Sequence, residues 1–569
     1  MEPSELEEIK LQQKNGKNLG WSRIYLQKLR NYFREYCEVS SIQGLSYIGK
    51  KSSIIERIWW ITIFTICVSG SSLMVYKIFD KWSKTPVLVS LATKEEPIYD
   101  IPFPAVTICP ESKISTQCSN YTKILMARIR KNMKNTTYTE NKYFDYMGLL
   151  CSSKNHDPSM QLGNRSLLEL FNESIPELND RYPTDFHVPD YGDFLYDCAA
   201  VKLKEAYCQW MGVTRSCVDL MTPIITDEGL CYTFNMFNQK ELYSEINQAK
   251  MYDWEKKSNW NPDFGYPQHR VEEVYPRRIF LNGAKNSFTA VFFTRKDQLD
   301  HGCRDFSLQG IRVSLNIPTR IPRPSQVFFS VGLNRFTSAA VTPSTTSVAK
   351  SIQVYDPLKR NCYFSNERKL KYFQIYSQGN CNIECWTNFT LSKCNCVNFH
   401  MPRDNQTKVC SLQERFCLEQ ARVEYPQAVL SERLWAQSTN ISKREGMVFD
   451  CKCLPFCSDL IYNAEITSGK WDFDNLDEAL FDDMRDFTDE HYASAVRVYF
   501  KNSFFLPMKK DELYGTTDAI SDIGGVLGLF IGFSLFSVAE IVYFLSIRLI
   551  ESYRLRHFNS NKITPTERY

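Results

Sequence analysis

The residues most suggestive of chemistry lie near the end of the chain, where small side chains precede a single acid in an apolar run. Gly524, Gly528 and Gly532 recur every four residues, and Glu540 is the one charged residue from Gly524 to Ile547. This spacing places the glycines on one helical face, where backbones can approach closely. A carboxylate at membrane depth costs roughly 2.5–3.5 kcal/mol and usually faces a bundle interior or a watery path. The pattern predicts either a pore wall or a face that only packs helices.

Passage of a small cation requires oxygen atoms in place of its hydration water and a negative field along its path. Gly532 and Ser534 can offer backbone carbonyls and a hydroxyl, while Asp522 and Glu540 would form two acidic rings. Residues 511–547 contain no Lys or Arg, which disfavours an anion path.

Two segments are long and apolar enough to cross a bilayer as helices, which takes about 20 residues. Residues 58–76 carry no charge, and residues 520–547 include the glycines described above. Both termini then share one side of the membrane. Residues 1–57 are rich in Lys and Arg, so we expect residues 1–57 and 548–569 to be cytoplasmic. Residues 77–519 would be one large extracellular domain.

Two counts support an extracellular position for residues 77–519. Of the twenty cysteines, only Cys37 and Cys67 fall elsewhere, and the remaining even number suits an oxidised domain. All seven Asn-x-Ser/Thr glycosylation motifs also fall there: Asn120, Asn135, Asn164, Asn172, Asn388, Asn405 and Asn440.

Composition and motifs exclude several functional classes. The net charge is +3 and no long block of Lys and Arg occurs, which argues against nucleic-acid binding. Hydrolase, metalloprotease and nucleotide-binding signatures are absent, and there are only seven histidines. We therefore expect no enzyme activity and no cofactor.

The predicted extracellular domain shows both kinds of periodicity. Residues 310–317 and 495–500 alternate as half-buried strands do, whereas Leu476, Leu480 and Met484 have helical spacing. An α+β domain around a sheet is expected. The polar segment 235–276 is interpreted as an exposed insertion. The acid-rich segment 472–490 is either a proton or divalent-cation sensor or, as we favour, a solvated helix face.

The cysteines from Cys362 to Cys457 cluster with short spacings that also occur at zinc sites. Glycosylation motifs interleave with them, and thiolates outside the cell would oxidise. Disulfides are therefore favoured over metal, and no metal site is predicted.

Several motifs together resemble the degenerin/epithelial sodium channel/acid-sensing channel superfamily, most of all its insect pickpocket branch. Residues 103–110 (FPAVTICP) are similar to the family's signature after the first span, and 229–235 (GLCYTFN) to a second one. Residues 362–364 through 401–404 are similar to its cysteine-rich region. Gly532-Phe533-Ser534 stands at the Gly/Ser-x-Ser selectivity filter. The resemblance runs from about residue 44 to 550.

The resemblance implies a trimeric channel architecture of two membrane helices per chain with a large disulfide-rich extracellular domain. It also implies seven disulfides, namely Cys109–Cys231, Cys208–Cys217, Cys362–Cys457, Cys381–Cys453, Cys385–Cys451, Cys394–Cys417 and Cys396–Cys410. Cys118, Cys151, Cys198 and Cys303 remain, and four cysteines allow three connectivities.

Two further positions take their roles from the resemblance. Ser521 matches the degenerin position, where a small side chain is needed for closure. The cytoplasmic gating motif, usually His-Gly, is Gln43-Gly44 here, and glutamine cannot take up a proton near neutral pH. We expect Gly44 to preserve the turn, and the ring of Phe533 to point away from the pore axis.

The function implied is a sodium-preferring, amiloride-sensitive cation channel subunit of the plasma membrane, as homotrimer or heterotrimer. Gating would pass from the extracellular domain into the pore helix, in response to a peptide, small ligand, proton or stretch. Two alternatives stay open: an ATP-gated type of two-span trimeric receptor channel, and a non-conducting regulatory or receptor subunit.

Overall fold

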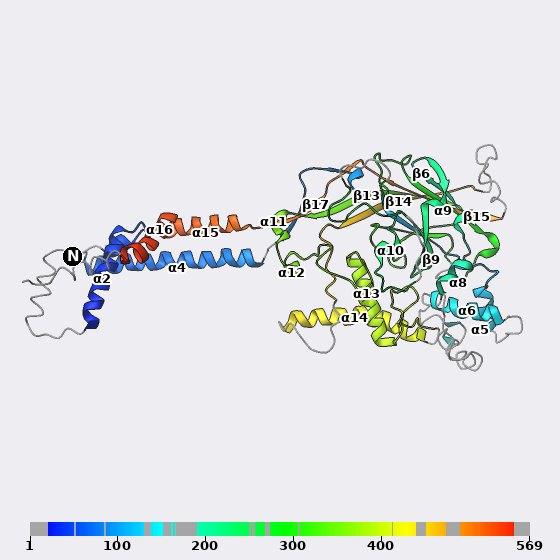
Figure 1. The fold of residues 1–569 in the computed structure, drawn as a ribbon, viewed down its shortest axis with the longest axis horizontal. Coiled ribbons are helices and arrows are strands. Elements are labelled where there is room, and N and C mark those ends of the chain that lie inside the picture. The colour runs from blue at the N-terminus through cyan, green and yellow to red at the C-terminus, as the bar shows by residue number, and fades with distance from the viewer. Residues whose placement is uncertain are drawn as a thin grey trace, which may run out of the picture. The chain divides into compact units, whose positions relative to one another are not determined.

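The computed structural model describes residues 21–49, 53–84, 87–129, 138–151, 161–162, 165–166, 191–249, 252, 256–267, 274–304, 308–411, 414–439, 451–473 and 490–550. It divides into two compact units (Figure 1). Residues 89–511 form the larger unit, and the two ends of the chain together form the smaller one.

The larger unit is built on two β-sheets. One has the strand order β1-β17-β13-β15-β10-β6-β7, with β14 also paired to β13, and the other has the order β12-β11-β3-β9-β8. The strands are β1 (Val87–Leu91), β3 (Ala105–Pro110), β6 (Tyr207–Trp210), β7 (Val213–Ser216), β8 (Met221–Thr226), β9 (Gly229–Phe234), β10 (Phe288–Arg295), β11 (Ile311–Asn316), β12 (Phe329–Val331), β13 (Arg335–Val348), β14 (Leu460–Lys470), β15 (His491–Phe500) and β17 (Met508–Glu512).

Most neighbouring strands are antiparallel, but β13 runs parallel to β15 and β17. Strands β11 and β15 lie where alternation predicted them. Apolar side chains of β3, β9 and β10 are fully buried and form a common core. Within it, the rings of Phe234 and Phe288 stack at a centroid distance of 4.0 Å.

Helices and short strands surround these sheets in the larger unit. The longest are α13 (Gln378–Cys394) and α14 (Arg415–Thr439). The others are α5 (Tyr121–Ile129), α6 (Tyr138–Cys151), α8 (Tyr191–Asp197), α9 (Cys217–Leu220), α10 (Gln239–Leu242), α11 (Lys350–Gln353), α12 (Pro357–Arg360), the 3-10 turns η1 (Ile98–Asp100), η3 (Leu203–Glu205) and η4 (Lys296–Gln298), and the strands β2 (Glu96–Pro97), β4 (Gln161–Leu162), β5 (Arg165–Ser166) and β16 (Phe504–Phe505).

Nine disulfides crosslink the larger unit. Seven are the pairs implied by the resemblance, and the other two are Cys118–Cys198 and Cys151–Cys303. The clustered cysteines are thus bonded to one another rather than available to zinc. Among the described residues, no group of His, Cys, Asp and Glu could hold a metal ion.

The segment 235–276 differs from its prediction. Asn235, Leu242 and Trp260 are buried, and Leu242 has no exposed surface. Asn235 Nδ2 donates a 2.6 Å hydrogen bond to the carbonyl of Phe103. Its polar composition had suggested an exposed insertion, but aromatic and aliphatic side chains spaced along it reach the core. The acid-rich prediction largely falls on residues 474–489, outside the described residues.

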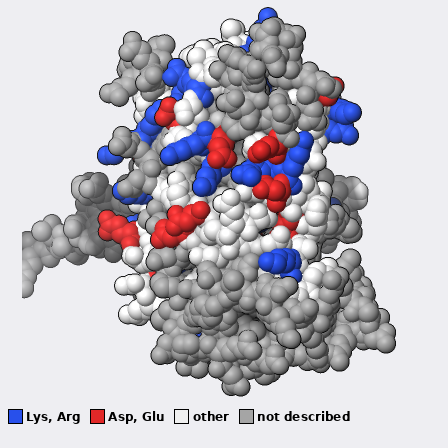
Figure 2. Space-filling model, turned by 90° about the vertical axis from the view of Figure 1, so that its right-hand side faces the viewer, with Lys and Arg blue, Asp and Glu red and all other residues white. Residues whose placement is uncertain are grey.

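Charges of both signs are mixed on one face of the molecule. Figure 2 shows Lys and Arg side chains beside Asp and Glu side chains, separated by uncharged surface. Among the described residues on this face, the arrangement offers neighbouring opposite charges rather than one wide field of a single sign. Of the glycosylation motifs, Asn388 and Asn405 are exposed.

Candidate functional site

The smaller unit contains the residues that the sequence assigned to a pore. Its helices are α2 (Trp21–Val39), α3 (Leu45–Gly49), α4 (Ile54–Lys84), α15 (Thr516–Ile531) and α16 (Leu535–Tyr543), followed by the π-helical turn η8 (Phe544–Arg548). Figure 1 shows α15 running alongside α4. Gly70 permits this approach, because a Cβ atom there would lie 3.0 Å from the Phe530 ring. Helix α4 is long and apolar enough to cross a membrane.

The helix predicted over 520–547 is not continuous. Helix α15 ends at Ile531, and α16 begins at Leu535 after a bend of 74°. Gly532 caps α15 with a φ of 67°, a left-handed conformation that glycine adopts without steric cost. Its N–H binds the carbonyl of Gly528 at 3.0 Å. The prediction of one helix was wrong because apolar composition alone does not reveal a left-handed cap.

The loop between α2 and α3, which contains Gln43, lies directly against this break. The N–H of Gln43 donates to the carbonyl of Ile531 at 3.0 Å. A Cβ atom on Gly532 would approach Cγ of Gln43 to 2.8 Å, so the side chain of Gln43 occupies the space beside the glycine. Gly44 has a φ of 94° and faces the Phe64 ring. The structure therefore brings the predicted gating motif and filter together, although they are far apart in sequence.

Next to the loop, three serines and one acid form a polar cluster. Ser41 contacts Glu540 through both its N–H, at 2.8 Å, and its hydroxyl, at 3.0 Å. The hydroxyls of Ser41 and Ser537 lie 2.8 Å apart. Ser537 also accepts a 3.1 Å hydrogen bond from the N–H of Ser534, the residue that caps α16. The cluster connects Ser534, the predicted filter serine, to Glu540.

Sequence reasoning found Ser534 and Glu540 but missed Ser41 and Ser537. A signal for Ser537 existed, because it stands three residues after Ser534 at the start of a helix, where capping-box partners occur. Ser41 gave no such signal, since its partners lie about 500 positions away in the chain.

Toward the other end of α15, the residues predicted to lie at the outer mouth of the pore are exposed. Asp522 accepts a hydrogen bond from the hydroxyl of Tyr514, and both Ser521 and Asp522 are exposed. A Cβ atom on Gly524 would meet no described atom within 4 Å. Gly528 has only the carbonyl of Phe533 at 3.9 Å. The face of α15 around Ser521 and Gly524 is therefore not covered by other described residues.

Helix α2 contacts the η8 turn that follows α16. Arg548 forms a 2.6 Å ion pair with Glu35, and the hydroxyl of Tyr32 donates to the carbonyl of Phe544. An apolar cavity of about 870 Å³ lies between these elements, lined by Leu29, Arg30, Tyr32, Phe33, Tyr36, Ile541, Phe544, Leu545 and Leu549. The N-terminal segment and the last helical turn are thus held as one structure.

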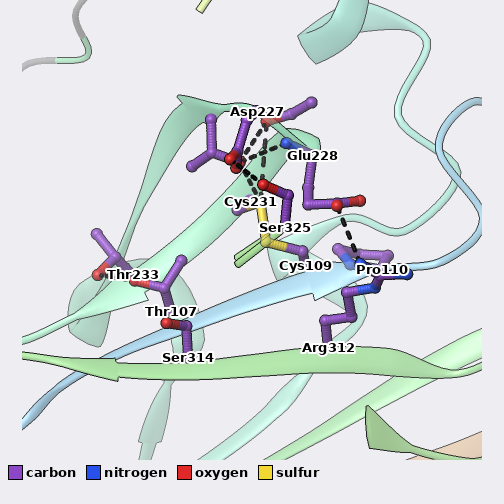
Figure 3. The surroundings of a disulfide bond; sticks show 12 residues. Thr107, Cys109, Pro110, Asp227, Glu228, Cys231, Thr233, Arg312, Ser314 and Ser325 are labelled. Carbon is purple, nitrogen blue, oxygen red and sulfur yellow. Dashed lines mark hydrogen bonds and ion pairs between the residues drawn. A yellow bond between two sulfur atoms is a disulfide. The ribbon is translucent and has the colours of Figure 1, made fainter. Parts of the chain in front are cut away.

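The larger unit holds a different charged group, buried beside the Cys109–Cys231 disulfide (Figure 3). Glu228 binds Arg304 at 2.9 Å and Arg312 at 3.0 Å. Glu111 binds Arg312 at 2.7 Å and also pairs with Arg304. Lys113 lies 3.5 Å from Glu228. We call these five residues the buried ion cluster.

Electrostatics within the buried ion cluster push the pKa values in defined directions. Burial opposes the charged form of Glu111, but Lys113, Arg304 and Arg312 together outweigh it and lower the pKa of Glu111. Burial and the positive charge of Arg304 hold the pKa of Lys113 well below its ordinary value. Three basic side chains thus surround two carboxylates.

Comparisons with known proteins bear on both units. A sequence model of the family described as "Amiloride-sensitive sodium channel" matches residues 36–544. The chain is 26% identical over 528 residues to pickpocket protein 28 of Drosophila melanogaster, covering 90% of this chain and 78% of that protein. It is 21% identical over 535 residues to sodium channel protein Nach of the same species, covering 93% and 89%. Acid-sensing ion channel 2 of Rattus norvegicus is 26% identical over 181 residues, 31% of each chain.

Proposed function

Because the chain belongs to the amiloride-sensitive sodium channel family, we propose that it is a sodium-preferring, amiloride-sensitive cation channel subunit of the plasma membrane. Three subunits, identical or related, would surround one pore in the bilayer. Members of this family are ion channels rather than enzymes. Because the chain belongs to this family, we no longer consider the ATP-gated type of receptor channel as an alternative.

One observation supports the proposal most strongly: the loop around Gln43 lies against the break between α15 and α16. The loop bonds to Ile531 and fills the space beside Gly532. A break at this point leaves the carbonyls of Gly532 and Phe533 outside a regular helical ladder, where they can replace water around an ion. Helix packing alone does not require such an exposed turn.

We assign roles on this basis. Gly532, Phe533 and Ser534 form the filter, Asp522 and Glu540 are acids at its two sides, and Ser521 is the gate position on the exposed face of α15. Residues 54–84 and 516–548 would be the two membrane passages, with both termini in the cytoplasm. Gln43 and Gly44 support the filter from the cytoplasmic side. A stimulus acting on the larger unit would reach α15 through β15, β16 and β17, the three strands that precede it in the chain.

Expression in oocytes tests the proposal. The chain is expressed alone and together with related subunits, and inward sodium current is recorded with and without amiloride under a panel of peptides, small ligands, acid and stretch. An amiloride-blocked sodium current that depends on this chain supports a conducting subunit.

A substitution in the filter attributes the current to this chain. Ser534→Ala should change the ratio of sodium to potassium permeability in any complex that contains the subunit, whereas Ser72→Ala should not. The Ser72 hydroxyl is bonded to its own helix, at the carbonyl of Val68. Normal surface delivery with no current in any combination, or permeability unchanged by Ser534→Ala, would favour a non-conducting subunit.

A further inference from the structure

The carboxylate of Glu540 is held on one side only. Its Oε2 atom accepts hydrogen bonds from the N–H and the hydroxyl of Ser41. Its Oε1 atom accepts none from the described residues, and no described Lys or Arg pairs with it. Hydrogen bonds to an ionised acceptor are short and directional. The two bonds therefore fix the orientation of the carboxylate while leaving one oxygen and the net charge uncompensated.

Ser41 is itself oriented by the helix that carries the acid. Its hydroxyl contacts the hydroxyl of Ser537, which has no exposed surface and receives the N–H of Ser534. Ser537 and Glu540 lie three positions apart on α16, so they project from neighbouring points of one helical face. The loop residue is thus held at two points of this face, and its position depends on the residue that follows the break.

We propose that Ser41 is a positioning residue for Glu540, which turns the free carboxylate oxygen toward the passing cation and thereby sets cation binding at the cytoplasmic end of the pore. This inference rests on the proposed function, because it requires that α16 lines the pathway. A hydroxyl and an N–H can orient the acid without cancelling its charge. A Lys or Arg at position 41 would instead remove the negative field that attracts a cation.

The first test is block of the sodium current by cytoplasmic Mg²⁺, recorded in excised patches from a complex shown to conduct. Glu540→Gln should weaken the block and lower single-channel conductance, because the charge is lost. Ser41→Ala removes one of the two hydrogen bonds to the acid, and should weaken the block by between about twofold and tenfold. Ser41→Thr keeps the hydroxyl and should restore it.

The second test separates positioning from folding. If Ser41 acts through Glu540, adding Ser41→Ala to Glu540→Gln should not weaken Mg²⁺ block further, since coupled residues are non-additive. Ser72→Ala is the matched control, because its hydroxyl bonds within α4. Surface biotinylation reports delivery. If the Ser41→Ala variant does not reach the cell surface, Ser41→Cys is used instead. Cysteine has a similar size but is only a weak hydrogen-bond donor, so a partial loss of Mg²⁺ block is expected.

The outcomes distinguish this inference from the proposed function. A weaker block in Glu540→Gln with unchanged block in Ser41→Ala overturns the positioning role while leaving the channel assignment intact. Additive effects in the double variant also overturn it. An unchanged block in Glu540→Gln removes Glu540 from the pathway and the inference with it, whereas absence of any current from the wild-type chain contradicts the proposed function itself.

Discussion

The two units treat their charges and their surfaces in opposite ways. In the larger unit, Glu111 and Glu228 are fully enclosed and each is paired with arginines. In the smaller unit, the carboxylate of Glu540 is hydrogen-bonded only to Ser41 among the described residues, and a Cβ atom on Gly524 would meet no described atom within 4 Å. The larger unit pairs these two carboxylates within its own fold, whereas the smaller one leaves Glu540 without a described cationic partner.

This difference indicates where stability and function are located. A buried carboxylate must be compensated within the fold, because an unpaired charge away from water is costly. The exposed face of α15 and the free carboxylate oxygen of Glu540 need partners from outside the chain. In the proposed channel these partners are further subunits, lipid and a passing cation. Substitutions in the buried ion cluster should therefore affect folding, while those in the smaller unit should affect current.

The largest effect is expected from Glu228→Gln. The substitution removes one of the two buried carboxylates that Arg304 and Arg312 share and leaves only Glu111 opposite both arginines, and breaking a buried pair in this way costs about 3–5 kcal/mol. Thermal unfolding of the purified full-length channel and its surface delivery measure the loss. Glu465→Gln is the control, because its pair with Lys501 is exposed and should contribute no more than about 1 kcal/mol. Equal effects of the two substitutions would contradict the comparison.

Ser521→Phe should produce standing sodium current without a stimulus. Ser521 lies on the exposed face of α15, where a larger side chain would crowd its symmetry mates in a closed bundle. Overpacking costs about 1–3 kcal/mol, and 1.4 kcal/mol is about tenfold in population. Two-electrode recording measures the current, and Ser521→Ala should close normally. Normal delivery without added current would remove Ser521 from the gate.

Lys113→Met should have a smaller effect than Glu228→Gln, and in the opposite direction. Three basic side chains surround two carboxylates in the buried ion cluster, so removing Lys113 leaves two arginines opposite two carboxylates. The pKa of Lys113 is lowered in the folded protein, so the unfolded chain binds more protons between that pKa and the ordinary value, and stability rises with pH there. The variant should have an unfolding temperature no lower than that of the wild type, and its stability should not increase with pH in this range. A destabilisation as large as that of Glu228→Gln would show that the two arginines and two carboxylates are not sufficient without Lys113.

Acid should act on the larger unit through Glu111. Because its pKa is lowered in the folded protein, the stability it contributes is present above the ordinary value and is lost as pH falls through the lowered pKa. Glu111→Gln should therefore unfold at a lower temperature than wild type at neutral pH, with the difference shrinking in strong acid. A difference that stays constant with pH would show that packing rather than charge is responsible.

Glu540→Gln is expected to have the smallest effect on folding. Its carboxylate has no described ion pair, so the amide should leave thermal unfolding and surface delivery nearly unchanged while single-channel cation conductance falls. A drop in unfolding temperature comparable to Glu228→Gln would show that the smaller unit also depends on its acid for stability.

Some features could be predicted because the signal is local. Alternating residues in 495–500 indicated β15, and the apolar run 58–76 indicated the centre of α4. Other features are not local. The polar segment 235–276 was predicted to be exposed because its buried side chains, such as Leu242, are few and widely spaced, and only the sheet core shows that they are covered.

By itself, the sequence indicated the family, which the family match confirms, and it predicted the extracellular position of the cysteines and the filter residues, because these inferences depend on residue types at fixed spacing. The tertiary structure decided that α15 and α16 are separate helices, that Ser41 reaches Glu540, and that Glu111 and Glu228 share their arginines. The last two contacts join residues that are distant in the chain, and the side chain of Gln43 occupies the space beside the left-handed cap at Gly532. Local spacing carries no information about such partners, because only the packing of the whole unit brings them within reach.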